Sequence, residues 1–494
     1  MPVGRSLAGR VSGELHALGA GELAGLIRAR EISPVEVVDA SLARIEERDG
    51  ALNACTVVLR EDARARAREA ERAIAAGEGA GPLHGVPVAI KDAIWVRGEP
   101  ATLGSRAFAD FRPTEDAAPV RRLRDAGAII VAKTTNSELL WSGYTATELF
   151  GVTRNPWDLR LTPGGSSGGS GAAVASGMVP LALGTDAGGS VRIPAAFCGV
   201  VGHKPTHGLV ARSPAFEEMR SLNVVGPLAR SVADARLCLD VIAGPDPADN
   251  LSVPIERRSQ PLANRLPAGV RIAWSEKLGE HPVDPGIAER FHVALAALAR
   301  AGWQLVEDSP DVCDLGEISM PILLTELPPM LAGREHLLSP ALQELFQQGA
   351  ERSAREYFAA QLKRAEFTSR VETFFQGYDA LLTPTTSMAP FAADPQGQID
   401  IAGTSVDVDL DTAPYNLTVL ANLTGGPAAS VPAGLDGHGL PVGLHVTCRR
   451  FADDLCLQLA EAAAELLPRL GSPPSPVQEP NQASPSDDRA PGHG

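Results

Sequence analysis

Hydrophobic residues near the start of the chain follow a helical period in some segments and form short apolar runs in others. Residues 33–36 read SPVE, a capping box with proline at the first helical position, and apolar residues then recur at helical spacing. Further helices are predicted over 61–76 and 119–126, and apolar runs at 86–90 and 128–132 indicate buried strands. This alternation of helices and buried strands is typical of an α/β sheet protein.

The same patterns continue more weakly to about residue 470. A helical period marks 288–302 and 452–467, and most of 317–372 is predicted to be helical. Residues 471–494 hold almost no apolar residues, which predicts a disordered tail. Further strands are predicted at 179–186, 304–308, 379–386, 428–434 and 440–447.

A glycine- and serine-rich tract, PGGSSGGSG at 163–171, interrupts this pattern. Such tracts are usually flexible linkers, because glycine loses much conformational entropy on folding. Here a helix over 172–176 and the strand at 179–186 are predicted to follow directly, so the tract joins elements of one structural unit. We therefore interpret it as a site where backbone N–H groups approach a ligand closely.

Composition and charge narrow the class of protein. The 494 residues carry a formal net charge of −16, whereas nucleic-acid binding needs clustered Lys and Arg. The six cysteines lack CxxC spacing, there is no signal-peptide-like apolar segment, and no apolar run approaches the roughly 18 residues of a membrane span. We expect a cytoplasmic protein with reduced thiols that binds neither nucleic acid nor membrane. No metal-ligand spacing is present, and no cofactor is expected.

Lysine is rare in this chain, and one lysine stands where chemistry is expected. Only five of the 44 basic residues are lysines. Lys91 directly follows the strand predicted at 86–90, and open α/β sheets bind ligands at the carboxyl ends of their strands. Unlike Arg, Lys can lose its proton, so Lys91 is a candidate general base.

Two familiar interpretations of the serines fit poorly. GGSSG at 164–168 matches the G-x-S-x-G turn of α/β-hydrolases, with Ser166 as the nucleophile. However, His203 and His207 have no obvious acidic partner before them, and we interpret both histidines as structural. A phosphate-binding loop would require a following G-K-[ST] sequence, which is absent.

A third interpretation joins Lys91, a serine of the tract and Ser190 of TDAGGS. A desolvated, neutral lysine can act as a base, and a second serine can relay the proton to it from the nucleophile. Glycines before Ser190 would leave backbone N–H groups free to bind an oxyanion. The residue chemistry alone does not rank this pattern above the others.

Several segments of the chain resemble the amidase signature family. The longest, residues 161–206, contains both the glycine-rich tract and TDAGGS, and its length makes the resemblance highly specific. The resemblance extends over about residues 10–465. The other segments that carry it are GVPVAIKD (85–92), VTRNPWD (152–158), residues 422–434 and residues 439–446.

The resemblance implies one large α/β domain over residues 1–470, with a central twisted mixed β-sheet covered by α-helices. Within it we expect N-terminal helices at 10–80, a catalytic core at about 81–245, and a variable substrate-pocket region at about 310–372.

By the same resemblance, Ser190 is the nucleophile that forms an acyl-enzyme. Ser166 is the bridging serine, which follows a cis peptide bond from Gly165, and Lys91 is the base. Residues that would hold these groups in place are Ser167, Asp186 and Arg192. The oxyanion hole is expected at the N–H groups of Ala187, Gly188, Gly189 and Ser190.

The implied activity is hydrolysis of amide C–N bonds, with carbamates (urethanes) and esters as related substrates. A stand-alone hydrolase, such as an aryl acylamidase or a urethanase, is favoured over the glutaminase subunit of a tRNA-dependent amidotransferase. No residues that would bind the ammonium and carboxylate groups of glutamine are identifiable in the sequence. An inactive binding scaffold is a third alternative, against which the intact serines and lysine argue.

Specificity is expected to lie in variable segments that hold apolar and aromatic residues. The partner implied is a small-molecule amide or carbamate. Dimers are common among such enzymes, so a homodimer is a candidate assembly, although the sequence indicates no interface. The candidate pocket residues are Trp141, Tyr144, Phe216 and Met219.

Overall fold

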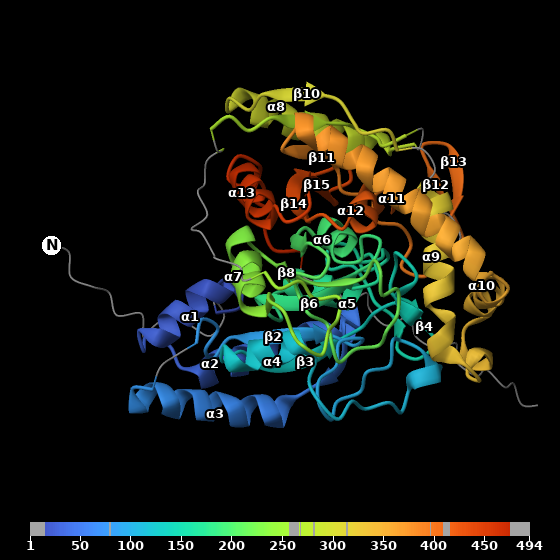
Figure 1. Ribbon diagram of the computed structural model, residues 1–494. Helices are drawn as coiled ribbons and strands as arrows, with labels where there is room; N and C mark the ends of the chain where they lie inside the picture. The colour runs from blue at the N-terminus through green and yellow to red at the C-terminus, as the bar shows by residue number, and fades with distance from the viewer. Residues whose placement is uncertain are drawn as a thin grey trace, which may run out of the picture.

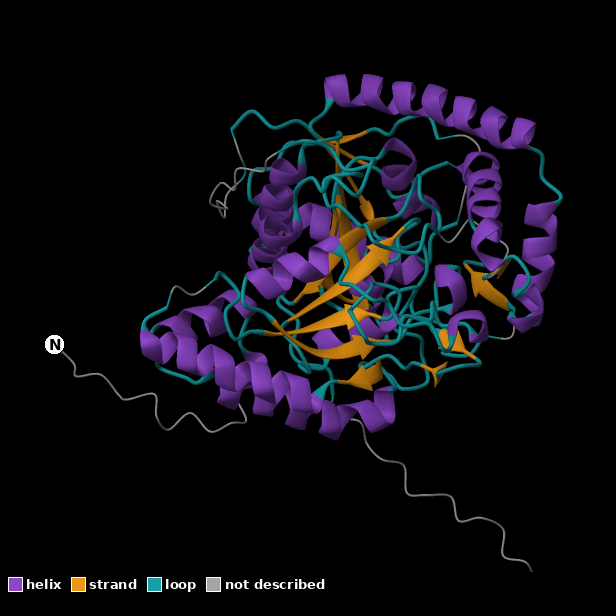
Figure 2. Ribbon diagram, turned by 60° about the horizontal axis from the view of Figure 1, so that its bottom comes forward, coloured by secondary structure: helices purple, strands orange, loops and turns teal. Residues whose placement is uncertain are grey.

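A twisted mixed β-sheet of 11 strands runs through the molecule, with helices on both of its faces (Figure 2). The computed structural model describes residues 15–78, 81–255, 266, 268–279, 282–312, 315–395, 397–408 and 415–474. In order across the sheet, the strands are β1 (Cys55–Val58), β3 (Ile129–Thr134), β2 (Pro87–Lys91), β6 (Leu181–Asp186), β8 (Val224–Ala229), β7 (Val201–Lys204), β14 (Ala428–Leu435), β15 (Pro441–Cys448), β11 (Ala380–Pro384), β9 (Ile272–Trp274) and β10 (Leu305–Glu307).

Parallel pairing in one part of the sheet brings two charged residues to the same edge. Strand β2 pairs in parallel with both β3 and β6, whereas β8, β7, β14 and β15 follow in antiparallel order. Because parallel neighbours end at the same edge of a sheet, Lys91 at the end of β2 and Asp186 at the end of β6 lie at one edge. Two small hairpins complete the strands: β4 (Ala146–Thr147) with β5 (Gly151–Val152), and β12 (Gln398–Ile401) with β13 (Thr404–Asp407).

Helices cover the sheet in two layers, because successive side chains of a strand point to opposite faces. In β2, Val88 and Ile90 pack in the core formed with α1, α4, α7, α8 and α13, whereas Ala89 packs in the core formed with α2, α3, α5 and α6. These helices are α1 (Ala20–Arg28), α2 (Pro34–Leu52), α3 (Arg60–Ala76), α4 (Ala118–Asp125), α5 (Gly168–Ala175), α6 (Arg192–Cys198), α7 (Val232–Ile242), α8 (Pro285–Arg300) and α13 (Asp453–Ala464).

A third group of helices packs together around a separate apolar cluster beside the sheet (Figure 1). The long helix α11 lies against α9 and α12, and α10 lies against α9. Together with the loops around residues 101–108 and 216–222, this group forms one side of the site described below. The four helices are α9 (Leu315–Glu326), α10 (Pro340–Ala350), α11 (Ala354–Gly377) and α12 (Asn416–Thr424).

The glycine-rich tract is packed tightly inside the protein and is no linker. The Gly165–Ser166 peptide bond is cis, as the family resemblance implied. Gly165 passes so close to the backbone that a Cβ there would lie 2.5 Å from the carbonyl oxygens of Ser142 and Tyr144. Helix α5 begins at Gly168 and not at 172 as predicted. Its first two residues are glycines where a Cβ would lie within 2.5 Å of neighbouring atoms.

Most other predicted elements are present with shifted ends. The SPVE segment forms a capping box at the start of α2, and the strand predicted at 179–186 begins only at Leu181. Several elements of the structure were not predicted. Strand β8 contains Pro227, and proline argues against a central strand, whereas α6 is a helix of only seven residues whose Pro194 lies in the tolerant first turn. Of the predicted disordered tail, residues 475–494 lie outside the described part of the chain.

The described residues also bear on the predictions from composition. None of the helices in the described part of the chain is long and apolar enough to cross a membrane. Cys55, Cys198, Cys238, Cys448 and Cys456 are all free thiols.

We expect Gly169→Ala to destabilise the fold. A Cβ at Gly169 would lie 2.5 Å from the carbonyl oxygen of Ala54, and overpacking of this kind costs about 1–3 kcal/mol. The matched control is Gly25→Ala in α1, where a Cβ meets nothing within 4 Å and alanine is the better helix former. Urea denaturation should show a lower free energy of unfolding for the first variant only. Equal midpoints would contradict the close packing described for the tract.

Candidate active site

Three elements bring the predicted catalytic residues together at one edge of the sheet. Lys91 ends β2, Ser166 and Ser167 directly precede α5, and Ser190 lies in the loop between β6 and α6. Lys91 and Ser166 are fully buried, whereas Ser190 is partly exposed. The nucleophile candidate is therefore the member of this group that solvent can reach.

The Lys91 amine is surrounded by three hydroxyl groups. Its Nζ atom lies 2.7 Å from Ser166 Oγ, 2.9 Å from Ser167 Oγ and 2.7 Å from Thr185 Oγ1. Burial disfavours the ammonium form and lowers the pKa of Lys91 from 10.5 to about 7, although nearby carboxylates oppose this effect. A substantial fraction of Lys91 is therefore neutral near pH 7.

The number of N–H bonds and lone pairs on Lys91 limits which hydroxyl can donate to the neutral amine. A protonated Lys91 donates to all three hydroxyls, whereas the neutral amine has two N–H bonds and one lone pair. Ser167 directs its own hydroxyl proton to the carbonyl of Thr185, at 3.2 Å. The lone pair of Lys91 is thus left to the hydroxyl of Ser166 or to that of Thr185.

A buried ion pair fixes the loop that carries Ser190. The Asp186 carboxylate accepts from Arg192 Nε and Nη2 at 2.9 and 2.8 Å, and both side chains are fully buried. Burial alone would raise the pKa of Asp186, but Arg192 and Asn422 hold it below its usual range. The same carboxylate accepts from the backbone N–H groups of Gly189 and Val191, at 2.8 and 3.1 Å.

The loop leaves three N–H groups of the predicted oxyanion hole available. Among the described residues, the backbone N–H groups of Ala187, Gly188 and Ser190 donate to no protein acceptor. The N–H group of Gly189 differs, because it donates to Asp186 Oδ1. Gly189 also has a φ of +133°, and a Cβ there would collide with Thr418 and Ile193. Gly189 thus shapes the loop, and its N–H group is directed away from an oxyanion role.

Ser190 opens into a mainly apolar cavity of about 70 Å³. Two of the predicted pocket residues, Trp141 and Met219, line it. No charged side chain is found among the described residues that line this cavity. Besides Ser190 and these two residues, the lining consists of Leu140, Ser142, Gly143, Gly165, Ala187, Gly188, Ile193, Ser319, Met320, Leu323, Val408, Tyr415 and Val419.

The other two predicted pocket residues lie elsewhere. Phe216 belongs to an aromatic cluster, with ring centroids 5.7, 5.2 and 5.1 Å from those of Trp95, Phe108 and Phe111. Tyr144 lines a neighbouring cavity and packs edge-on against Phe391. Phe216 therefore belongs to the apolar cluster beside the Ser190 cavity and does not line the cavity itself.

Sequence reasoning missed several residues of the site. Thr185 directly precedes Asp186 in the TDAGGS motif, so its proximity to the strand end was a usable signal. Tyr415 and Asn422 gave no such signal, because they lie more than 200 residues further along the chain. Tyr415 closes one side of the cavity, where its hydroxyl accepts from the Gly143 N–H at 3.2 Å.

The other two buried lysines, and the two histidines interpreted as structural, contact groups outside this arrangement. Lys133 donates to the carbonyls of Asp92, Ile94 and Pro100, which anchors the segment that follows Lys91. Lys204 is also fully buried and donates to the Pro205 carbonyl. His203 lies 3.5 Å from Asp453, and His207 contacts the Arg220 carbonyl. No group of His, Cys, Asp or Glu within the described ranges could hold a metal ion.

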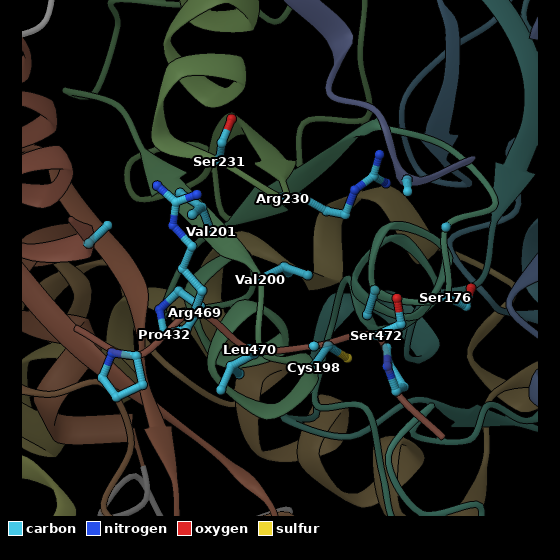
Figure 3. A pocket seen from close by; sticks show the side chains of 18 of the residues that line it. Ser176, Cys198, Val200, Val201, Arg230, Ser231, Pro432, Arg469, Leu470 and Ser472 are labelled. Atoms are coloured by element: carbon cyan, nitrogen blue, oxygen red, sulfur yellow. The ribbon is translucent and has the colours of Figure 1, made fainter. Parts of the chain in front are cut away.

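A separate cavity of about 400 Å³ lies at the other end of α6 from Ser190 (Figure 3). Cys198, Val200, Arg230 and Arg469 lie around it, and none of the residues predicted for the site lines it. The arrangement of Lys91, Ser166 and Ser190 is therefore confined to the edge formed by β2 and β6.

Comparison with known proteins agrees with this geometry. The family model described as Amidase matches residues 36–457. A glutamyl-tRNA(Gln) amidotransferase subunit from Salinispora tropica is 37% identical over 91% of this chain and 97% of its own length. An acylamidase from Rhodococcus erythropolis is 36% identical over 90% of this chain and 94% of its own length.

A solved structure shows the same likeness in three dimensions. The crystal structure of a bacterial aryl acylamidase, described as an amidase signature enzyme, superposes with a TM-score of 0.84 at 30% identity. The match covers 92% of this chain and 96% of that one. The chain belongs to the amidase signature family of C–N hydrolases.

Proposed function

We propose that this protein hydrolyses amides through an acyl-enzyme on Ser190, with Ser166 as proton relay and Lys91 as base. The observation that carries the proposal is the buried Lys91 amine, 2.7 Å from Ser166 Oγ and with a pKa lowered to about 7 by burial. A base that is neutral near physiological pH can accept a proton that an ordinary lysine could not.

In the proposed reaction, Lys91 accepts the hydroxyl proton of Ser166, and Ser166 accepts that of Ser190. Ser190 Oγ attacks the carbonyl carbon, and the developing oxyanion accepts hydrogen bonds from the N–H groups of Ala187, Gly188 and Ser190. The tetrahedral intermediate collapses, and the proton returns through Ser166 to the leaving nitrogen. Water then attacks the ester carbonyl of the acyl-enzyme by the same proton route and releases the acid.

The cavity beside Ser190 supports a stand-alone hydrolase of substrates with an apolar acyl group. Its described lining offers no charge to the ammonium and carboxylate groups of glutamine. Ser319, Met320 and Leu323 of α9 contribute to it, which supports assigning the variable pocket region to residues 310–372. The 36% identity to an acylamidase agrees with this choice. Anilides and aryl carbamates are the substrate classes we favour.

The glutaminase subunit of a tRNA-dependent amidotransferase is the second candidate, because a glutamyl-tRNA(Gln) amidotransferase subunit is 37% identical over most of the chain. The deciding experiment measures amine or ammonia release from an anilide, an aliphatic amide, an aryl carbamate and glutamine, with Ser190→Ala beside the wild type. Turnover of the apolar substrates that is lost in the variant supports the stand-alone hydrolase. Activity on glutamine alone would instead assign the protein to the amidotransferases.

A fluorophosphonate should label Ser190, because such reagents modify activated serines. Ser190→Ala should abolish labelling and lower kcat/KM by roughly 10⁴-fold or more. The matched control is Ser170→Ala, since Ser170 belongs to the same tract but its hydroxyl contacts Thr134 and the Leu183 carbonyl. Mass spectrometry of the labelled peptide decides the assignment, and a label on Ser166 would favour the α/β-hydrolase interpretation.

The kcat/KM for an amide should rise with pH to a plateau, with a midpoint near 7. Below that pH Lys91 is protonated and cannot act as a base, since burial has lowered its pKa to about 7. Lys91→Arg should lose about 10²–10⁴-fold in kcat/KM on the plateau above this midpoint, because a guanidinium stays charged at every pH tested. Lys363→Arg is the control, as Lys363 is exposed and pairs with Glu317. A midpoint near the ordinary lysine value of 10.5 would refute this role of Lys91.

A further inference from the structure

A second cavity adjoins the one beside Ser190. It has a volume of about 500 Å³, and both cavities are lined by Trp141 and Ser142. Ligand sites usually measure about 300–1,000 Å³, so the Ser190 cavity of about 70 Å³ is small for a complete substrate. A substrate larger than a short acyl group therefore needs space beyond this cavity, and the second cavity adjoins it at Trp141 and Ser142.

The position of Ser166 indicates which end of the substrate enters the second cavity. In the proposed reaction Ser166 returns a proton to the leaving nitrogen, so the leaving group lies on the Ser166 side of the nucleophile. Gly165, the neighbour of Ser166, packs against the backbone of Ser142 and Tyr144. Both of these residues line the second cavity, and Gly165 lines the cavity beside Ser190, so the second cavity lies on the Ser166 side of the nucleophile.

The walls of the second cavity combine an apolar surface with acidic side chains. Leu342 and Leu345 of α10 and Val152 of β5 supply apolar contacts. Among the described residues, no basic side chain lines it. Three carboxylate residues do: Glu138, Glu148 and Asp394.

The three carboxylates differ in how far their charge is already compensated. Glu138 accepts from the Ser105 hydroxyl at 2.7 Å and from the Ser339 N–H at 3.2 Å. Glu148 pairs with Arg106 at 2.8 Å, and both side chains are about half exposed. Asp394 is exposed and forms no ion pair with a described residue. With one guanidinium against three carboxylates, this wall is negative overall.

We propose that the second cavity, lined by Trp141, Ser142, Glu138, Glu148 and Asp394, is the leaving-group subsite and favours an amine that carries a further positive charge. The proposal rests on the proposed amide hydrolysis and names the substrate class of the same site. Apolar walls hold the body of the leaving amine, and the carboxylates attract a cationic group at its far end while repelling an anionic one.

The test compares three anilides with one short acyl group and different para substituents on the aniline: aminomethyl (cationic), methyl (neutral) and carboxymethyl (anionic). A primary amide with the same acyl group, whose leaving group is only ammonia, serves as the reference for each enzyme variant. The wild type should favour the cationic over the anionic anilide in kcat/KM, and added salt should weaken this preference because it screens exposed charges.

The double variant Glu148→Gln/Asp394→Asn should reduce the cationic-to-anionic ratio of kcat/KM. Exposed ion pairs are modest, so we expect a change of about two- to fivefold for each carboxylate removed. The control is Asp158→Asn, which removes a partly exposed carboxylate paired with Arg160 and outside both cavities, and which should leave the ratio unchanged.

A second variant tests the size of the subsite independently of its charge. Ala341→Trp places an indole at an exposed position of the cavity wall on α10, where a larger side chain does not threaten folding. It should lower kcat/KM for all three anilides relative to the primary amide. The subsite proposal is wrong if the double variant keeps the cationic-to-anionic ratio of kcat/KM and Ala341→Trp keeps the ratio of each anilide to the primary amide. If the wild type hydrolyses neither the anilides nor the primary amide, the proposed amide hydrolysis itself is wrong.

Discussion

The buried ion pair between Asp186 and Arg192 is the interaction on which the site depends. The carboxylate ends β6, the guanidinium begins α6, and the loop between them carries Ser190. Arg192 also donates to the carbonyl of Thr418 and to the side chain of Asn422, both on α12. One pair of charges therefore fixes the nucleophile loop, a strand end and a helix from the far end of the chain.

Such a pair is costly to disturb. Removing one partner of a buried ion pair leaves an uncompensated charge, which typically costs about 3–5 kcal/mol. The loop gains its definite shape from the same arrangement, because Asp186 binds the N–H groups of Gly189 and Val191 and leaves those of its neighbours free. The position of the Asp186 carboxylate thus determines which N–H groups of the loop remain available.

Sequence patterns predicted the parts of this arrangement that depend on local structure. The apolar run before Lys91 correctly placed that lysine at the carboxyl end of a strand, and elements on both sides of the glycine-rich tract argued against a linker. The patterns failed where contacts between distant segments determine whether an element forms or where a side chain lies. Pro227 argued against a strand at β8, but pairing with β6 and β7 on either side outweighs this local preference. Phe216 lies in an aromatic cluster away from the Ser190 cavity, and no local signal distinguishes the two environments.

The burial of lysine has a practical consequence. Lys91, Lys133 and Lys204 are fully enclosed, whereas Lys277 and Lys363 are exposed. Only the latter two lysine side chains are open to amine-directed reagents such as activated esters, and the abundant arginines do not react with them. Tethering the protein to a solid support or attaching a dye through lysine will therefore occur in a few defined orientations, without touching the amine that the reaction needs.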